Sequence, residues 1–175
     1  MRAFCARRGR GRVHGMNIRQ TDVPEGSLIA DYARREGHYT DCFTVEGQAG
    51  LPDLITAFYT QPLFKAERLV LRLAARCPST DAEAAQLAEG ASDRFAVWTV
   101  AARTETELLM ADASGRTMSW LSVAGGLFFG SVVVPVRDRR GRLTLGPVFH
   151  TLLKVHVLYS RALLAGAVRR LRSRG

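Results

Sequence analysis

The chain has 175 residues, of which 47% are hydrophobic and 23% are charged, and its formal net charge at pH 7 is +9. This length predicts one domain with a substantial core, and this composition excludes a chain that is disordered throughout. The positive charge lies at the two ends: residues 1–15 hold five arginines, and residues 139–175 hold eight arginines and Lys154, both without an acid. Residues 16–138 hold 11 basic and 16 acidic residues, so the body of the chain is acidic.

The basic N-terminal stretch predicts a disordered tail over residues 1–16, followed by a single domain over residues 17–175. The stretch is rich in Gly and directly precedes Met16, so a start of translation at Met16 rather than Met1 is an alternative. It lacks the apolar run of a secretory signal. No zinc-finger, helix-turn-helix or RNA-recognition motif is present, which argues against nucleic acid as a partner.

Motifs for metals and cofactors are missing from the sequence. Cys5, Cys42 and Cys77 are odd in number and widely spaced, which favours free thiols in a reducing cytosol over disulfides or a zinc site. There is no G-x-G-x-x-G, Walker loop, G-x-S-x-G or H-E-x-x-H. We therefore expect no metal and no cofactor, and a cytoplasmic location.

The first elements follow a lead-in over residues 17–37, in which Leu28–Ala33 predicts a short helix. Residues 38–45 alternate between apolar and polar, and this period of two predicts the first strand. One face of that strand would carry Tyr39, Asp41, Phe43 and Val45.

Three helices are predicted next. The first opens at Leu51-Pro52 and ends near Thr60, because Pro62 breaks the pattern. Thr80–Glu83 has the form of a capping box and predicts a short surface helix to about Glu89. Between them, a second helix ends at Pro78 and has apolar residues at helical spacing at Leu63, Ala66, Val70, Leu73 and Cys77.

Four strands are predicted after these helices, at residues 94–102, 105–111, 117–124 and 127–137. Short connections with turn residues favour antiparallel neighbours. Residues 117–136 also form a run of 20 uncharged residues, which is long enough to span a bilayer. The Gly125-Gly126 pair inside this run is better explained as a hairpin turn than as part of a membrane helix.

Apolar residues at helical spacing from about Pro147 to Leu171 predict a long terminal helix. Its basic end suits the negative pole of the helix dipole, and docking on an acidic partner or lipid surface is the alternative interpretation. Strands followed by one long helix predict an α+β, helix-grip fold. In it, a curved antiparallel sheet wraps around the terminal helix, two short helices follow the first strand, and a pocket is enclosed.

Three segments carry a resemblance to a known family: HYTDCF, AFYTQPLF…LVLRL and GPVFHTLLKVHVLYSRALL, in this order. Over about residues 38–172 the chain resembles an uncharacterised bacterial family of the START-like (SRPBCC) superfamily. The resemblance implies a sheet wrapped around the C-terminal helix with a cavity between them. The superfamily includes lipid and hormone carriers, aromatic polyketide cyclases and ring-hydroxylating oxygenase domains. This family has no assigned catalytic residues to carry over, and the oxygenase iron motif is missing here.

Aromatic residues in separate elements are candidates for the walls of a ligand cavity, although the same residues would also make a plain core. The candidate ligand-binding residues are Tyr39, Tyr59, Trp98, Trp120, Phe129 and His150.

Candidate polar residues are few. His150 is the candidate acid or base, with a structural histidine as the alternative. His156 lies about 240° further around the helix, so the two histidines do not form a paired metal site. Asp41 is expected to orient Tyr39 or a helix terminus rather than to catalyse, and Arg72 to serve the surface or a salt bridge rather than a ligand carboxylate.

Three functions are compatible with this sequence. The first is binding of an apolar or aromatic small molecule, lipid-like or polyketide-like, in the internal cavity. The second is a cavity enzyme of cyclase, dehydratase or hydrolase type that uses His150 as acid or base. The third is a module that contacts a membrane surface or a protein through its basic ends. The identity of the ligand and the oligomeric state are beyond the sequence.

Overall fold

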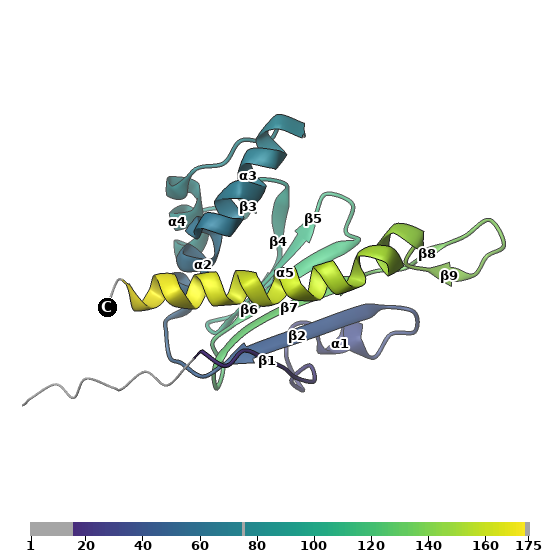
Figure 1. Cartoon of the computed structure of the whole chain (residues 1–175), viewed down its shortest axis with the longest axis horizontal. Helices are drawn as coiled ribbons and strands as arrows, with labels where there is room; N and C mark the ends of the chain where they lie inside the picture. The colour runs from purple at the N-terminus through teal and green to yellow at the C-terminus, as the bar shows by residue number, and fades with distance from the viewer. Residues whose placement is uncertain (1–15, 75, 174–175) are drawn as a thin grey trace, which may run out of the picture.

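The computed structural model describes residues 16–74 and 76–173. The tail predicted over residues 1–16 therefore lies outside the described residues except for Met16, and Cys5 lies outside them too. The described chain is an α+β structure, in which an antiparallel sheet carries a long C-terminal helix across one face (Figure 1). This confirms the predicted arrangement of sheet and terminal helix, whereas three helices, not the two short ones of the predicted helix-grip fold, follow the strand at residues 39–45.

The main sheet has seven strands in the order β1-β2-β7-β6-β5-β4-β3, and every neighbouring pair is antiparallel. The strands are β1 (Arg19–Gln20), β2 (Tyr39–Val45), β3 (Arg94–Phe95), β4 (Trp98–Arg103), β5 (Glu107–Asp112), β6 (Thr117–Ser122) and β7 (Leu127–Val133). A separate hairpin joins β8 (Val136–Arg137) and β9 (Leu143–Thr144). The strand predicted as the first, at residues 38–45, corresponds to β2, because the short β1 was not predicted and comes before it.

Two predicted strands are each divided in the structure. Residues 94–102 were expected to form one strand, but Ala96 has a positive φ of 51° and makes the turn between β3 and β4. Residues 127–137 were expected to form another, but β7 ends at Val133 because Pro135 has no N–H for the ladder. At each boundary a single residue, Ala96 or Pro135, cannot continue the hydrogen-bonded strand.

The helices are α1 (Ala30–Ala33), α2 (Leu51–Thr60), α3 (Pro62–Ala74), α4 (Asp81–Glu89) and α5 (Pro147–Arg172). Between α2 and α3 the chain turns at Gln61, whose backbone is extended, as expected for a residue before proline. The capping box of α4 is formed by Thr80 and Glu83, as predicted. Within the described residues no helix is long and apolar enough to cross a membrane, and residues 117–136 form β6 and β7 instead.

Each face of the sheet has its own apolar layer. On one face, residues of β2 and β5–β7 pack against α2, α4 and α5, with Phe43, Phe58 and Leu164 almost completely buried. On the other face, the lead-in around α1 covers Cys42, Trp120 and Val132. The alternation along the strands therefore assigns successive side chains to different cores.

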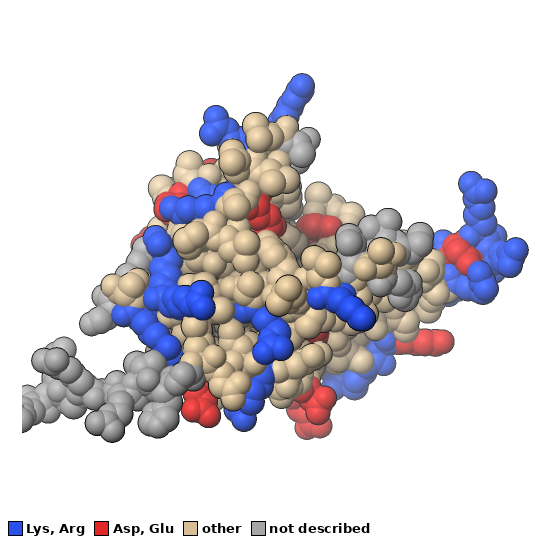
Figure 2. All heavy atoms as spheres, in the orientation of Figure 1, with Lys and Arg blue, Asp and Glu red and all other residues tan. Residues whose placement is uncertain are grey.

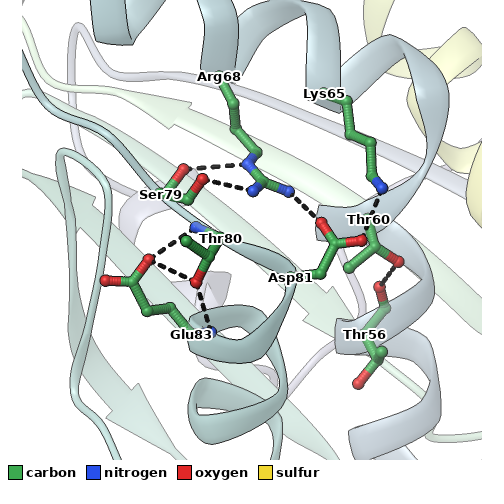
Figure 3. A network of polar contacts seen from close by, with 8 residues as sticks. All are labelled: Thr56, Thr60, Lys65, Arg68, Ser79, Thr80, Asp81 and Glu83. Atoms are coloured by element: carbon green, nitrogen blue, oxygen red, sulfur yellow. Dashed lines mark hydrogen bonds and ion pairs between the residues drawn. The ribbon is translucent and has the colours of Figure 1, made fainter.

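A polar network fixes α3 on α4 and is shown in Figure 3. The guanidinium of Arg68 donates to the Ser79 hydroxyl over 3.0 Å and to the Asp81 carboxylate over 2.6 Å. Lys65 donates to the other oxygen of Asp81 over 2.6 Å. Together with Phe64, which is buried, these contacts set the side of α3 that faces the protein.

The apolar positions that predicted α3 lie on its outer side. Leu63, Val70 and Leu73 are exposed, and Leu73 keeps 73% of its accessible surface. Cys77 lies beyond the end of the helix. The periodicity thus identified the helix but not its packed face, which carries the buried Phe64 and the Arg68 contacts instead.

The approach of α5 to the α2–α3 turn depends on Gly166. The buried Gln61 side chain donates to the Leu163 carbonyl of α5 over 3.0 Å. A Cβ at position 166 would lie only 1.8 Å from Gln61 Oε1. Glycine is tolerated here, despite its cost inside a helix, because it leaves room for this bond.

We predict that Gly166→Ala lowers the free energy of unfolding by about 1–3 kcal/mol, since the added methyl overpacks the contact. The measurement is chemical denaturation of the two single variants and the double variant with Gln61→Ala. In the Gln61→Ala background the same substitution should cost much less, because the clashing atom is gone. Equal costs in both backgrounds would contradict this role for Gly166.

Candidate functional site

A cavity of about 170 Å³ lies between the sheet and helices α2, α3 and α5. Its walls come from three strands, β4, β6 and β7, and three helices, so it belongs to the body of the fold rather than to one loop. The lining residues are Phe58, Tyr59, Phe64, Glu67, Trp98, Thr117, Met118, Ser119, Phe129, Ser131, His156, Tyr159, Ser160 and Leu163.

Aromatic rings form much of the apolar wall. Phe58 of α2 packs on Phe129 of β7 with ring centroids 4.9 Å apart, and Tyr59 meets Phe64 edge-on at 4.8 Å. Three of the aromatic residues selected from the sequence, Tyr59, Trp98 and Phe129, are among the lining residues. The packing of helices on the sheet thus brings them together from α2, β4 and β7.

Trp120 is not part of the cavity wall. It belongs to the core on the opposite face of the sheet, where its indole N–H donates to Glu107 over 2.8 Å. Since side chains alternate along a strand, Trp120 of β6 points away from its neighbour Ser119, which does line the cavity.

Among the described side chains, Tyr39 does not line the cavity either. The Tyr39 hydroxyl donates to Asp41 over 3.4 Å, as expected from the sequence, and its ring meets Phe149 edge-on at 4.9 Å. His150 lies in the first turns of α5, and its side chain lies outside the described part of the structure. Arg72 lies on the exposed side of α3.

A polar row crosses the floor of the cavity. In the sheet register Asp41 of β2 stands opposite Ser131 of β7, and Ser131 stands opposite Ser119 of β6. These side chains therefore share the face that α5 covers. Ser119 also forms a hydrogen bond with Tyr59, whose pKa is raised by burial.

The row ends in a buried carboxylate held by several donors. Asp41 Oδ1 accepts from the Ser131 N–H over 2.9 Å and from the Ser131 hydroxyl over 2.5 Å. Nε2 of His156 lies 3.1 Å from Asp41 Oδ2 and 2.8 Å from Ser131 Oγ. A proton on Nε2 of His156 would let the imidazole donate to this carboxylate. The side chain of Asp41 is fully buried, whereas that of His156 is 27% exposed.

A second polar contact joins α3 to α5 at the cavity. The Tyr159 hydroxyl donates to the Glu67 carboxylate in a short hydrogen bond. Burial raises the pKa of Glu67, and the bond from Tyr159 opposes that rise only in part. Burial, together with the nearby carboxylate, also raises the pKa of Tyr159. The cavity therefore disfavours negative charge on both groups.

Two lining residues have buried polar atoms without a hydrogen-bond partner among the described residues. These atoms are Nε1 of Trp98, which is a donor, and Oγ of Ser160, which is donor and acceptor. Buried polar atoms are nearly always paired in folded proteins, so an unpaired pair beside one cavity needs an explanation. A polar atom of a bound molecule would supply one.

Metal and thiol chemistry find little support at this cavity. Across residues 16–74 and 76–173 no group of three or more metal-ligating side chains comes together. Burial raises the pKa of Cys42 to about 12, so its thiol stays protonated and is a poor nucleophile. The arrangement is suited to hold an apolar molecule with a polar group, and to exchange a proton with it through His156.

Several lining residues were not selected from the sequence: Glu67, Thr117, Ser119, Ser131, Tyr159 and Ser160. The serines could have been found from the sequence. Ser119 and Ser131 lie two residues after Thr117 and Phe129, so on a strand each shares a face with that residue. No sequence pattern points to Glu67 or Tyr159, because the two residues are 92 positions apart and meet only through the packing of their helices.

Comparisons with known proteins add no assignment: a scan against protein-family models, a search of curated proteins and a search of solved structures each match nothing to this chain.

The raised pKa of Glu67 predicts a pH-dependent cost to stability. A carboxyl whose pKa is higher in the folded state stabilises the fold at low pH and loses this contribution as pH rises above its ordinary value of 4.5. Glu67→Gln should therefore gain stability over the wild type between pH 4.5 and 8, while keeping an acceptor for Tyr159. The measurement is urea denaturation across this pH range. Glu105→Gln, an exposed control, should show no such trend; parallel pH curves for Glu67→Gln and wild type would contradict the assignment.

Proposed function

We propose that this protein binds a small aromatic or apolar molecule in the cavity between its sheet and α5, within a START-like helix-grip domain. The observation that carries the proposal is the cavity itself, with aromatic walls and two unpartnered polar atoms. Concave apolar pockets with a few placed polar groups are typical of small-molecule sites. Apolar contact would supply affinity, and the polar atoms would select orientation.

The size of the cavity narrows the ligand class. A cavity of about 150 Å³ in another protein binds benzene, whereas pockets for drug-sized ligands are about 300–1,000 Å³. At about 170 Å³, this cavity fits one aromatic ring with small substituents. A single-ring molecule is therefore favoured over a lipid-like or polyketide-like one.

The polar atoms at the cavity narrow the ligand class further. Trp98 Nε1 only donates, so the ligand would carry an acceptor such as a hydroxyl or carbonyl oxygen. Near Glu67 and Tyr159, a neutral ligand is favoured over an anion, because the site already disfavours negative charge. Phenols and aromatic carbonyl compounds meet both requirements.

A reducing cytosol is the location that we propose for this activity. Cys42 and Cys77 are both free thiols in the structure, although Cys77 is only partly buried. Neither a metal nor a cofactor enters the proposed binding.

Phenol and toluene provide a matched pair of probes, since they differ by a hydroxyl and a methyl on one ring. We predict that both bind and that phenol binds more tightly. Trp98→Phe should weaken phenol binding by about 2–10-fold, the value of one neutral hydrogen bond, and leave toluene binding nearly unchanged. Ligand-detected NMR and native mass spectrometry on the full chain measure these affinities.

Ser160→Met serves as the blocking variant, because a flexible side chain at this buried lining position would fill the space. It should abolish binding of both probes while circular dichroism and thermal unfolding show a folded protein. Absence of binding by the wild-type protein, or unchanged binding by a folded Ser160→Met variant, would refute a ligand site at this cavity.

A second candidate function is catalysis, and the contact of His156 with Asp41 and Ser131 favours it. A buried carboxylate that orients an imidazole beside a cavity is an arrangement used for general acid–base chemistry. His156 would take the role that the sequence suggested for His150. A single-ring ester has a size that fits the cavity, and its hydrolysis is a reaction that an acid–base residue can assist.

The test uses 4-nitrophenyl acetate, whose hydrolysis releases a coloured phenol. A catalytic His156 predicts that His156→Gln loses about 10²–10⁴-fold in turnover while retaining phenol binding. Ser92→Ala, a change at a hydroxyl outside the cavity lining, is the control and should keep wild-type turnover. Equal turnover by wild type and His156→Gln would exclude this reaction and leave binding as the function.

A further inference from the structure

Six of the eight large apolar side chains that stand exposed among the described residues lie on two helices that pack together. They are Leu63, Leu69, Val70 and Leu73 on α3, and Val155 and Leu158 on α5. We call this set the α3/α5 apolar face. Exposed fractions reach 70% at Leu158 and 73% at Leu73, so these side chains are not covered by the rest of the fold.

The apolar face borders the cavity. Glu67 of α3 and Tyr159 of α5 line the cavity and bond to each other, which joins the two helices at this point. Val70 lies one turn from Glu67, and Val155 lies one turn from Tyr159, so each shares a side of its helix with a lining residue. The exposed apolar side chains are therefore neighbours of the lining groups.

The charge around this face is positive. Helix α5 contains no acidic residue, and its exposed side carries Lys154 and Arg161. Helix α3 adds the exposed Arg72, and its one acid, Glu67, is bonded to Tyr159. Figure 2 shows the corresponding surface, with uncharged atoms over α3 and the middle of α5, and Lys and Arg groups along α5 and at the end of α3.

From this combination we propose that the α3/α5 apolar face docks on the surface of an anionic lipid bilayer. Aliphatic side chains flanked by lysine and arginine are the pattern of helices that lie at a membrane interface. Each basic group near an anionic membrane contributes on the order of 1 kcal/mol, and insertion of the aliphatic groups adds to it. A second copy of the chain fits this face less well, because two copies would oppose their positive borders.

This docking goes beyond the proposed ligand binding and does not depend on it. A molecule dissolved in the bilayer would meet the protein at the helices whose Glu67–Tyr159 contact lines the cavity. Uptake of an apolar ligand from a membrane, rather than from water, would follow from that position.

Vesicle co-sedimentation of the full chain tests the proposal. Phosphatidylcholine vesicles with about a third phosphatidylglycerol should retain the protein at 50 mM salt, and binding should fall several-fold at 500 mM salt because the basic groups are screened. Pure phosphatidylcholine vesicles should bind far less. The variant Val70→Ser/Leu158→Ser should lose about tenfold or more in partitioning, since two exposed aliphatic groups no longer insert.

Matched controls make the outcome decisive. Val136→Ser/Leu143→Ser changes two exposed apolar residues of the β8–β9 hairpin and should bind like wild type. Lys154→Glu/Arg72→Glu should weaken binding to anionic vesicles. Circular dichroism confirms that each variant folds. The proposal is overturned if wild type ignores anionic vesicles, if Val70→Ser/Leu158→Ser binds normally, or if light scattering shows a dimer that this variant dissociates.

Discussion

The buried carboxylate of Asp41 is the contact on which the arrangement of sheet and helix depends. Burying an unpaired charge is very costly, so this position requires donors on every side. They come from the two strands and the helix that meet there: Tyr39 of β2, Ser131 of β7 and His156 of α5. A one-residue slip of β2 would carry Asp41 to the opposite apolar face, so the same group also specifies the strand register.

The cavity arises from the size of the side chains around this contact. Where α2 faces the sheet, large rings such as Phe58 and Phe129 fill the space between the layers. Under α5 the sheet side of the cavity carries Ser119 and Ser131, and the helix side carries Ser160. Small polar side chains on both sides cannot fill the same gap, which is why one face of a single sheet holds both a dense core and a hollow. A rigid frame around a small cavity is well suited to a defined ligand, and this supports binding as the leading proposal.

The sequence predicted the elements far better than their contacts. Hydrophobic period and proline punctuation are local properties, so α2, α4, α5 and the antiparallel order of the strands followed from them. Within the candidate site, Tyr59, Trp98 and Phe129 were found because large aromatics seek the interior, and Trp120 was misplaced because the pattern does not say which face of the sheet holds the cavity. The contact of Glu67 with Tyr159 depends on how two helices cross, and no local pattern contains that information.

The lead-in of the chain depends on a contact far away in sequence. Glu107 of β5 accepts from the backbone N–H of Leu28, 79 residues earlier, and from the indole of Trp120 with the same oxygen. The pairing of β5 with β6 holds Glu107 beside Trp120, so the segment around α1 is fixed to a surface that two other strands build. The anchoring of the N-terminal cover is therefore coupled to the β5–β6 pair, and loss of that pairing would release the cover as well, because its acceptor would no longer be held in place.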